Sequence, residues 1–203
     1  MSIPPYAASE PMNLFIITIL PLSTSLEHAP PPVQAIPHFL AAGHRVYLAA
    51  PLAGQAEEIR EALGVGGVLP LHRVAPSALL PLLLNGYRVG YWARRWRPEI
   101  YLSVGPRSAL LANGGRGAAD GDGISVQVLS SLQPESTHWV GQLLERRAIQ
   151  EADRLLTYEA AVAGDVVGHY GARGGDVTVL PDKQPRHFVS LCEQFLAEPP
   201  GFN

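Results

Sequence analysis

Polar side chains gather in the segment STSLEHAPPP, residues 23–32, directly after an apolar run. Ser23, Ser25 and His28 bring hydroxyl and imidazole groups that donate and accept hydrogen bonds. Groups of this kind can bind the hydroxyls of a small polar ligand. A solvated loop that binds nothing has the same composition, so the segment allows both interpretations.

A second polar segment, SSLQPESTHW, occupies residues 130–139 and also follows an apolar run. Glu135 and His138 are residue types that can form a general acid–base pair. The alternative is that Ser136 or Thr137 caps a helix that begins near residue 139. Residue types alone leave both interpretations open.

Apolar runs along the chain predict the strands that must position these segments. The run Leu14–Leu20 is continuous, which is typical of a strand that is buried on both faces of a parallel sheet. Further strands are predicted over 45–51, 68–74, 99–105, 124–131, 154–158 and 176–181. Helical patterns alternate with them over 33–43, 54–64, 76–96, 106–112, 140–152, 160–170 and 187–197.

This alternation predicts a single Rossmann-like α/β domain with a mostly parallel sheet of about seven strands and helices on both faces. Residues 1–12 form an N-terminal extension, 13–182 the domain, and 183–203 a C-terminal helix and tail. Parallel sheets of this type bind ligands at the carboxyl ends of their strands. Both polar segments follow strands, so both are predicted at that edge.

Two further segments carry structural predictions. The glycine-rich stretch GGRGAADGDG, residues 114–123, predicts a flexible surface loop. The final helix has an apolar face that is predicted to pack on the sheet, made of Phe188, Leu191, Phe195 and Leu196.

Composition excludes several classes of function. The net charge of −3 and the pI of about 6.1 give no electrostatic case for binding nucleic acid. Cys192 is the only cysteine, which excludes an internal disulfide and a cysteine metal site, and the histidines lack metal-ligand spacing. The sequence shows neither a signal peptide nor an apolar run long enough to span a bilayer, so a cytoplasmic location is expected.

Arginines cluster with tryptophans near residue 95. Arg94, Arg95 and Arg97 lie beside Trp92 and Trp96 at the end of a predicted helix. Basic residues at this end of a helix complement its dipole. A surface that contacts a membrane or a partner protein is the alternative interpretation.

Several residue patterns resemble the N-terminal, acceptor-side domain of GT-B glycosyltransferases of the family-4 type. The resemblance covers roughly residues 13–188 and includes a Gly-His pair before the second strand, an Arg-Pro pair before the fourth, and a helix–strand–helix–strand ending. The matching residues are Gly43, His44, Val46, Arg97, Pro98, Glu99, Gly105, Glu145, Ala148, Ala152, Asp153, Glu159, Tyr170, Gly171 and Pro181.

The resemblance implies a function that this domain performs together with another. In the family, this half binds the acceptor and a second domain binds the nucleotide sugar. We therefore expect an acceptor-side domain for a sugar or glycolipid, with no cofactor or metal of its own and no assigned catalytic residue. A donor-binding domain or subunit would supply the nucleotide sugar. The candidate acceptor-binding residues are Ser23, Ser25, His28, Ser103, Gly105, Arg107, Ser130 and His138.

The sequence departs from the family where the family does its chemistry. Leu26 and Glu27 stand where the family has a Gly-Gly loop, and Leu129 or Ser130 stands where it often has a histidine. These departures support a second hypothesis, a non-catalytic binding module for a partner protein. A third, an unrelated doubly wound hydrolase, has no nucleophile motif in this sequence. The first hypothesis predicts that the isolated chain does not transfer sugar.

Overall fold

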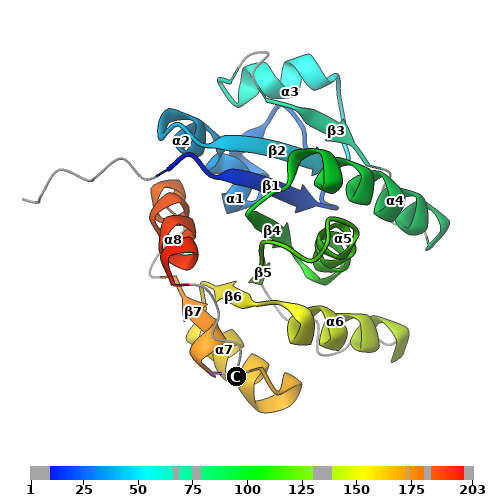
Figure 1. Ribbon diagram of the computed structural model, residues 1–203, viewed down its shortest axis with the longest axis vertical. Coiled ribbons are helices and arrows are strands. Elements are labelled where there is room, and N and C mark those ends of the chain that lie inside the picture. The colour runs from blue at the N-terminus through cyan, green and yellow to red at the C-terminus, as the bar shows by residue number, and fades with distance from the viewer. Residues whose placement is uncertain are drawn as a thin grey trace, which may run out of the picture.

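A computed structural model describes residues 10–65, 69–74, 79–129, 139–172, 174–180 and 184–198. It contains one seven-stranded sheet with the order β3-β2-β1-β4-β5-β6-β7, and all neighbouring strands are parallel (Figure 1). The single Rossmann-like α/β domain predicted from the sequence is confirmed. The strands are β1 (Asn13–Thr18), β2 (Arg45–Ala50), β3 (Leu71–Arg73), β4 (Ile100–Val104), β5 (Ile124–Leu129), β6 (Arg154–Thr157) and β7 (Val177–Val179).

Helices cover both faces of this sheet. One face carries α1 (Pro31–Gln34), α2 (Ile36–Ala41), α3 (Ala56–Ala62) and α8 (Pro185–Ala197). The other face carries α4 (Leu79–Trp96), α5 (Pro106–Ala118), α6 (Trp139–Glu151) and α7 (Ala160–Tyr170). Two short 3-10 turns, η1 (Leu26–His28) and η3 (Gly174–Asp176), complete the described elements.

The first predicted helix is divided in two. The sequence pattern predicts one helix over 33–43, but α1 ends before Ala35 and α2 begins after it. Pro37 lies in the first turn of α2, where backbone N–H groups have no acceptor within the helix, so the N–H that proline lacks is not needed there. The proline therefore determines where the second helix starts.

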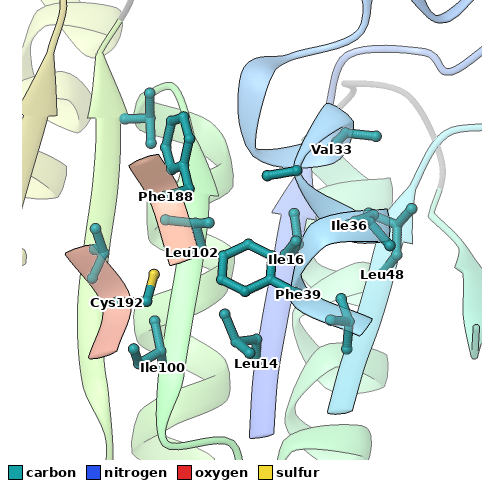
Figure 2. Packing of buried hydrophobic residues seen from close by; sticks show 14 of the residues in the cluster. Leu14, Ile16, Val33, Ile36, Phe39, Leu48, Ile100, Leu102, Phe188 and Cys192 are labelled. Carbon is teal, nitrogen blue, oxygen red and sulfur yellow. The ribbon is translucent and has the colours of Figure 1, made fainter. Parts of the chain in front are cut away.

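The larger part of the core lies between the sheet and the helices of the first face. Leu14, Ile16 and Leu102 project from the central strands, and Phe39 of α2 and Phe188 of α8 pack over them (Figure 2). The predicted apolar face of α8 is confirmed, because Phe188 and Phe195 are buried and Leu191 and Leu196 pack against the same cluster. This helix closes the face of the sheet with residues of the chain itself.

The segment 114–123 is not the flexible loop that its composition predicts. Helix α5 continues through it to Ala118, and only the residues that follow form a turn. A Cβ at Gly115 would lie 2.8 Å from a methyl carbon of Val89, and one at Gly90 would lie 3.0 Å from Cβ of Ala118. Glycine is therefore present because α4 and α5 pack closely, and burial in that contact outweighs its low helix propensity.

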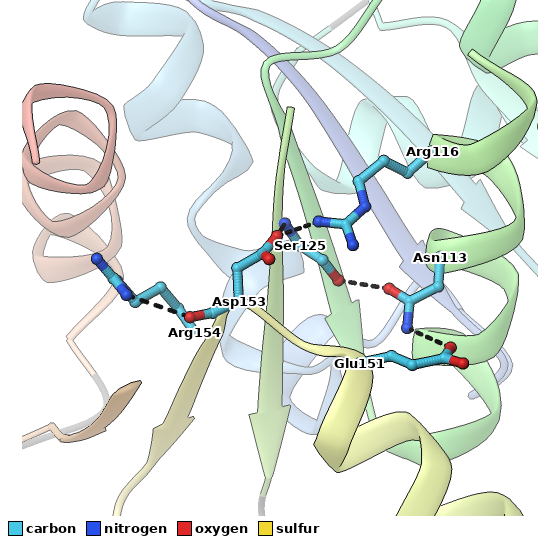
Figure 3. A network of polar contacts seen from close by, with 6 residues as sticks. All are labelled: Asn113, Arg116, Ser125, Glu151, Asp153 and Arg154. Carbon is cyan, nitrogen blue, oxygen red and sulfur yellow. Dashed lines mark hydrogen bonds and ion pairs between the residues drawn. The ribbon is translucent and has the colours of Figure 1, made fainter. Parts of the chain in front are cut away.

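A polar network fixes the amino edge of the sheet (Figure 3). Asp153, just before β6, accepts a hydrogen bond from the Ser125 N–H at 2.8 Å and pairs with Arg116 of α5. Asn113 accepts a hydrogen bond from the Ser125 hydroxyl at 2.6 Å and donates one to Glu151 at 3.2 Å. The network joins α5, β5, α6 and β6, so these residues act as scaffold.

Candidate functional site

The strand order places a topological switch point between β1 and β4. Chain connections run outward in opposite directions from these two strands, so the segments that follow them diverge at the carboxyl edge. Open α/β sheets bind ligands at this position. Here the segment after β1 and the first turn of α5 form the candidate site.

Hydrogen bonds fix the start of the segment after β1. The Ser108 hydroxyl of α5, which is fully buried, accepts the Ile19 N–H at 3.1 Å. The Thr18 hydroxyl accepts the Leu20 N–H at 3.0 Å. The two sides of the switch point are therefore connected directly, across 89 residues of sequence.

The same segment is also fixed on its other side. Leu22 donates its N–H to the Pro51 carbonyl and accepts the Ala53 N–H, both at 2.8 Å, which pairs it with the segment after β2. Farther along, the Gln34 amide donates to the carbonyls of Leu26 and Ala29. The backbone of this segment is therefore held by hydrogen bonds to the rest of the fold.

Three predicted site residues are exposed on this fixed segment. Ser23, Ser25 and His28 all face solvent, and the Ser23 hydroxyl donates to the Ser25 carbonyl at 3.2 Å. The structure thus brings their side chains to the carboxyl edge, as the sequence predicts. Their exposure leaves them available to contact a ligand.

Gly105 and Arg107 lie on the opposite side of the switch point. Gly105 has φ 78° and ψ 165°, a conformation that only glycine adopts without strain, and its N–H donates to the Val128 carbonyl at 3.1 Å. The exposed Arg107 lies in the first turn of α5, which contains no acidic residue. The guanidinium and the partial positive charge of the helix N-terminus make this side electropositive.

Ser103 does not belong to this surface. Its side chain is fully buried, and its hydroxyl donates to the Val126 carbonyl at 3.3 Å. β4 lies between β1 and β5 with helices on both faces, so all five of its residues are buried, and Ser103 lies inside the strand and not in the loop after it. The prediction that Ser103 lines the edge fails for this reason.

The sequence interpretation overlooked two buried polar residues near the edge. Ser108 is one, and its role depends on a contact that sequence spacing does not reveal. Gln127, aligned with Ser103 in the neighbouring strand, is fully buried, and its amide has no hydrogen-bond partner among the described residues. A glutamine inside the apolar run ISVQVL was the available signal.

The remaining predicted residues, Ser130 and His138, lie outside the described residues, as does the proposed partner Glu135. Their roles stay predictions. In the described part of the chain, no group of three acidic, histidine or cysteine side chains could hold a metal ion. Across those same residues, no helix has the length and apolarity required to cross a membrane.

The clearest pKa shifts arise from burial in the core. Burial raises the pKa of the Cys192 thiol, and the nearby Glu193 carboxylate raises it further. Burial also raises the pKa of Tyr101 to about 12. Both groups therefore stay neutral near pH 7, and Cys192 lacks the thiolate that a nucleophile needs.

Comparisons with solved structures identify proteins with a similar fold. UDP-GlcNAc 2-epimerase from Methanocaldococcus jannaschii superposes with a TM-score of 0.62 at 10% sequence identity, over 83% of this chain and 45% of that one. The lipopolysaccharide outer core galactosyltransferase WaaB, in its apo form, gives 0.62 at 13% identity, over 83% and 45%. The Anabaena protein HepE, in complex with UDP and glucose, gives 0.61 at 12% identity, over 83% and 44%.

These similarities show the fold alone, a Rossmann-like α/β domain similar to those of GT-B glycosyltransferase-like proteins. The chain spans less than half the length of each of these three structures. No family model matches the sequence, and a search of curated proteins finds no significant match.

Proposed function

We propose that this chain is the acceptor-side domain of a sugar-transfer system and that it acts only with a donor-binding domain or subunit. The observation that carries this proposal is the switch point between β1 and β4. There a fixed polar segment faces an electropositive helix start on a fold similar to that of a galactosyltransferase. The acceptor is a sugar or glycolipid, bound by Ser23, Ser25, His28, Arg107 and the backbone at Gly105.

The position of α8 supports a site at the carboxyl edge. This helix packs on the face of the sheet, and its end lies near the amino edge, where Arg154 donates to the Glu198 carbonyl at 3.1 Å. The helix contacts α1, while Ser23, Ser25 and His28 between β1 and α1 stay exposed. A donor-binding domain at this edge would complete a cleft between the two halves.

The same helix supports a second candidate function. Because Phe188, Cys192 and Phe195 of α8 close one face, the chain covers its own core there without a second domain. A non-catalytic module that binds a partner protein needs only such a self-contained fold. The two candidates differ in whether the carboxyl edge binds a sugar.

The binding test uses backbone amide NMR of the chain during titration with simple sugars, sugar phosphates and short glycolipid headgroups. We expect shifts confined to residues 19–28 and 105–109. Substitution of Arg107 by Gln and of His28 by Ala should weaken the response. The matched control is Arg186→Gln, an exposed arginine on α8.

The activity test uses the purified chain with a panel of nucleotide sugars and the same acceptors. We expect no transfer by the chain alone. Transfer should appear when a donor-binding domain is fused or added. Robust transfer by the chain alone would refute the proposal, and sugar-induced shifts away from the carboxyl edge would contradict the assigned site.

A further inference from the structure

The outer surface of α4 carries exposed aromatic and basic side chains. Tyr87 is 80% exposed and Tyr91 57% exposed, the two highest values among the exposed large hydrophobic residues of the described chain. Arg88 and Arg95 are exposed on the same helix. Two large aromatic side chains exposed on one helix and bordered by arginines are typical of a binding surface.

Helical geometry places these side chains on one face. At 100° per residue, Tyr87, Arg88, Tyr91 and Arg95 fall within an arc of about 100°. The opposite face of α4 packs into the domain through the buried Val89 and Ala93, among others. We call the exposed arc the α4 face.

The tryptophans of this helix are directed away from the α4 face. Trp92 lies against His72 of β3 with ring centroids 3.8 Å apart, and Trp96 stacks on Tyr47 of β2 at the same distance. The sequence pattern grouped Trp92 and Trp96 with the arginines, but these contacts make them anchors of the helix. They hold α4 rigidly on the sheet with the tyrosines outward.

Charge is distributed unevenly along the chain around this face. The stretch 62–98 contains five arginines, Arg73, Arg88, Arg94, Arg95 and Arg97, and no acidic residue. The whole chain has a net charge of −3, so the remainder carries −8. An otherwise acidic protein thus concentrates positive charge on and beside α4.

A shallow groove continues the α4 face toward the edge of the sheet. It is lined by Arg73, Tyr87, Arg88, Tyr91 and Trp92. Arg73 is held in position because it donates to the carbonyls of Leu52 and Gly54 at 3.3 and 3.2 Å. Phenol rings between guanidinium groups form a surface in which apolar area and positive charge alternate.

We propose that the α4 face docks on the surface of an anionic lipid bilayer. Tyrosine rings prefer the level of the lipid headgroups, where the ring is apolar and the hydroxyl stays hydrated. Arginines beside them attract anionic headgroups. The protein lies on the bilayer without crossing it, and the positive α4 face turns an otherwise acidic molecule toward the membrane.

The test is co-flotation of the chain with phosphatidylcholine vesicles, with and without phosphatidylglycerol. We expect partitioning onto the anionic vesicles that weakens as sodium chloride is added, because salt screens the charges. The double variant R88Q/R95Q should lower the partition coefficient about 30-fold. The double variant Y87A/Y91A should lower it at both low and high salt, because ring insertion is not screened.

The control variant is R146Q/R186Q, which removes two exposed arginines from α6 and α8. It should bind the vesicles as the wild type does, and circular dichroism should show all variants folded. Equal loss of binding in R88Q/R95Q and R146Q/R186Q would overturn the proposal. So would the absence of binding to anionic vesicles, or equal binding to neutral ones. Because no sugar is involved, failure here is distinguishable from failure of the proposed function.

Discussion

The His44 imidazole Nε2 lies 3.3 Å from a carboxylate oxygen of Glu193, which joins the start of β2 to α8. The other ring nitrogen of His44 accepts the Met12 N–H at 3.4 Å. One buried ring thus holds the first strand, the second strand and the last helix together.

Replacing His44 by Ala should lower the free energy of unfolding by about 2–3 kcal/mol, because a buried N–H loses its acceptor and a cavity forms beside Phe39. Glu193→Gln should cost only about 0.5 kcal/mol, since it removes the charge beside the ring and leaves the Met12 N–H bonded to His44. Urea denaturation measures both. Equal losses in the two variants would contradict this account.

The contact between α4 and α5 predicts that alanine substitutions at two neighbouring glycines change the stability of the fold in opposite directions. Gly115→Ala should destabilise by about 1–3 kcal/mol, because its Cβ would lie 2.8 Å from Val89. Gly114→Ala should stabilise by about 0.5–1 kcal/mol, since its Cβ enters open space and alanine favours the helix. Thermal unfolding of the two variants compares them directly, and effects of the same sign would show that α5 is packed differently.

Backbone conformation makes Gly105 sensitive to substitution although space is available. A Cβ there meets no atom within 4 Å, so Gly105→Ala creates strain only through its φ of 78°. We expect the substitution to lower the free energy of unfolding by about 1–3 kcal/mol. Chemical denaturation gives the value, with Gly114→Ala as the control. A neutral result would mean that the first turn of α5 adopts another conformation.

The hydroxyl of Ser108 should control the local stability of the segment after β1. Ser108→Ala leaves the Ile19 N–H without its acceptor, at a cost of about 1 kcal/mol. Hydrogen exchange should accelerate at Ile19 and Leu20 in the variant, with little change in the strands. Unchanged exchange at Ile19 would show that other contacts hold the segment.

The imidazole of His72 should make stability depend on pH. Burial of the ring against α4 lowers the pKa of His72 below the usual 6.5, and the positive charge of Arg60 lowers it further. The unfolded chain therefore binds the proton more readily, and stability is lost as pH falls from about 6.5 through the folded-state pKa. Urea midpoints at about pH 7.5 and about pH 5.5 measure this effect.

The matched variant for that measurement is His72→Phe, which keeps a ring against Trp92 but cannot titrate. The stability advantage of the wild type over the variant should shrink as the pH is lowered. Parallel pH profiles would show that other groups cause the dependence.

Much of the fold follows from local pattern. Continuous apolar runs predicted the strands, and for the run Leu14–Leu20 the structure agrees to within two residues, with β1 at Asn13–Thr18. Helix ends were also predictable, as at Gly171, whose left-handed conformation ends α7. The prediction of a loop from composition was wrong at 114–118, where glycine allows two helices to pack closely. The prediction of a single helix over 33–43 was also wrong, since the helix is divided at Ala35 and Pro37 lies in the first turn of α2.

Only part of the candidate site could be predicted from the sequence. Polar residues after β1 could be placed at the carboxyl edge because parallel strands align their ends, and Ser23, Ser25 and His28 are found there. The burial of Ser103 was open to prediction, since this residue lies inside the strand predicted over 99–105 and both faces of that strand are covered. Ser108 was missed because its partner is 89 residues away.

The sequence by itself determined the order of the elements and the class of fold, because alternating apolar periodicities are local properties of the chain. Only the tertiary structure decided which polar groups reach the surface, where α8 closes the sheet, and that Tyr87 and Tyr91 face outward while Trp92 and Trp96 pack inward. These outcomes depend on packing between segments far apart in sequence, and no local pattern encodes which surfaces meet.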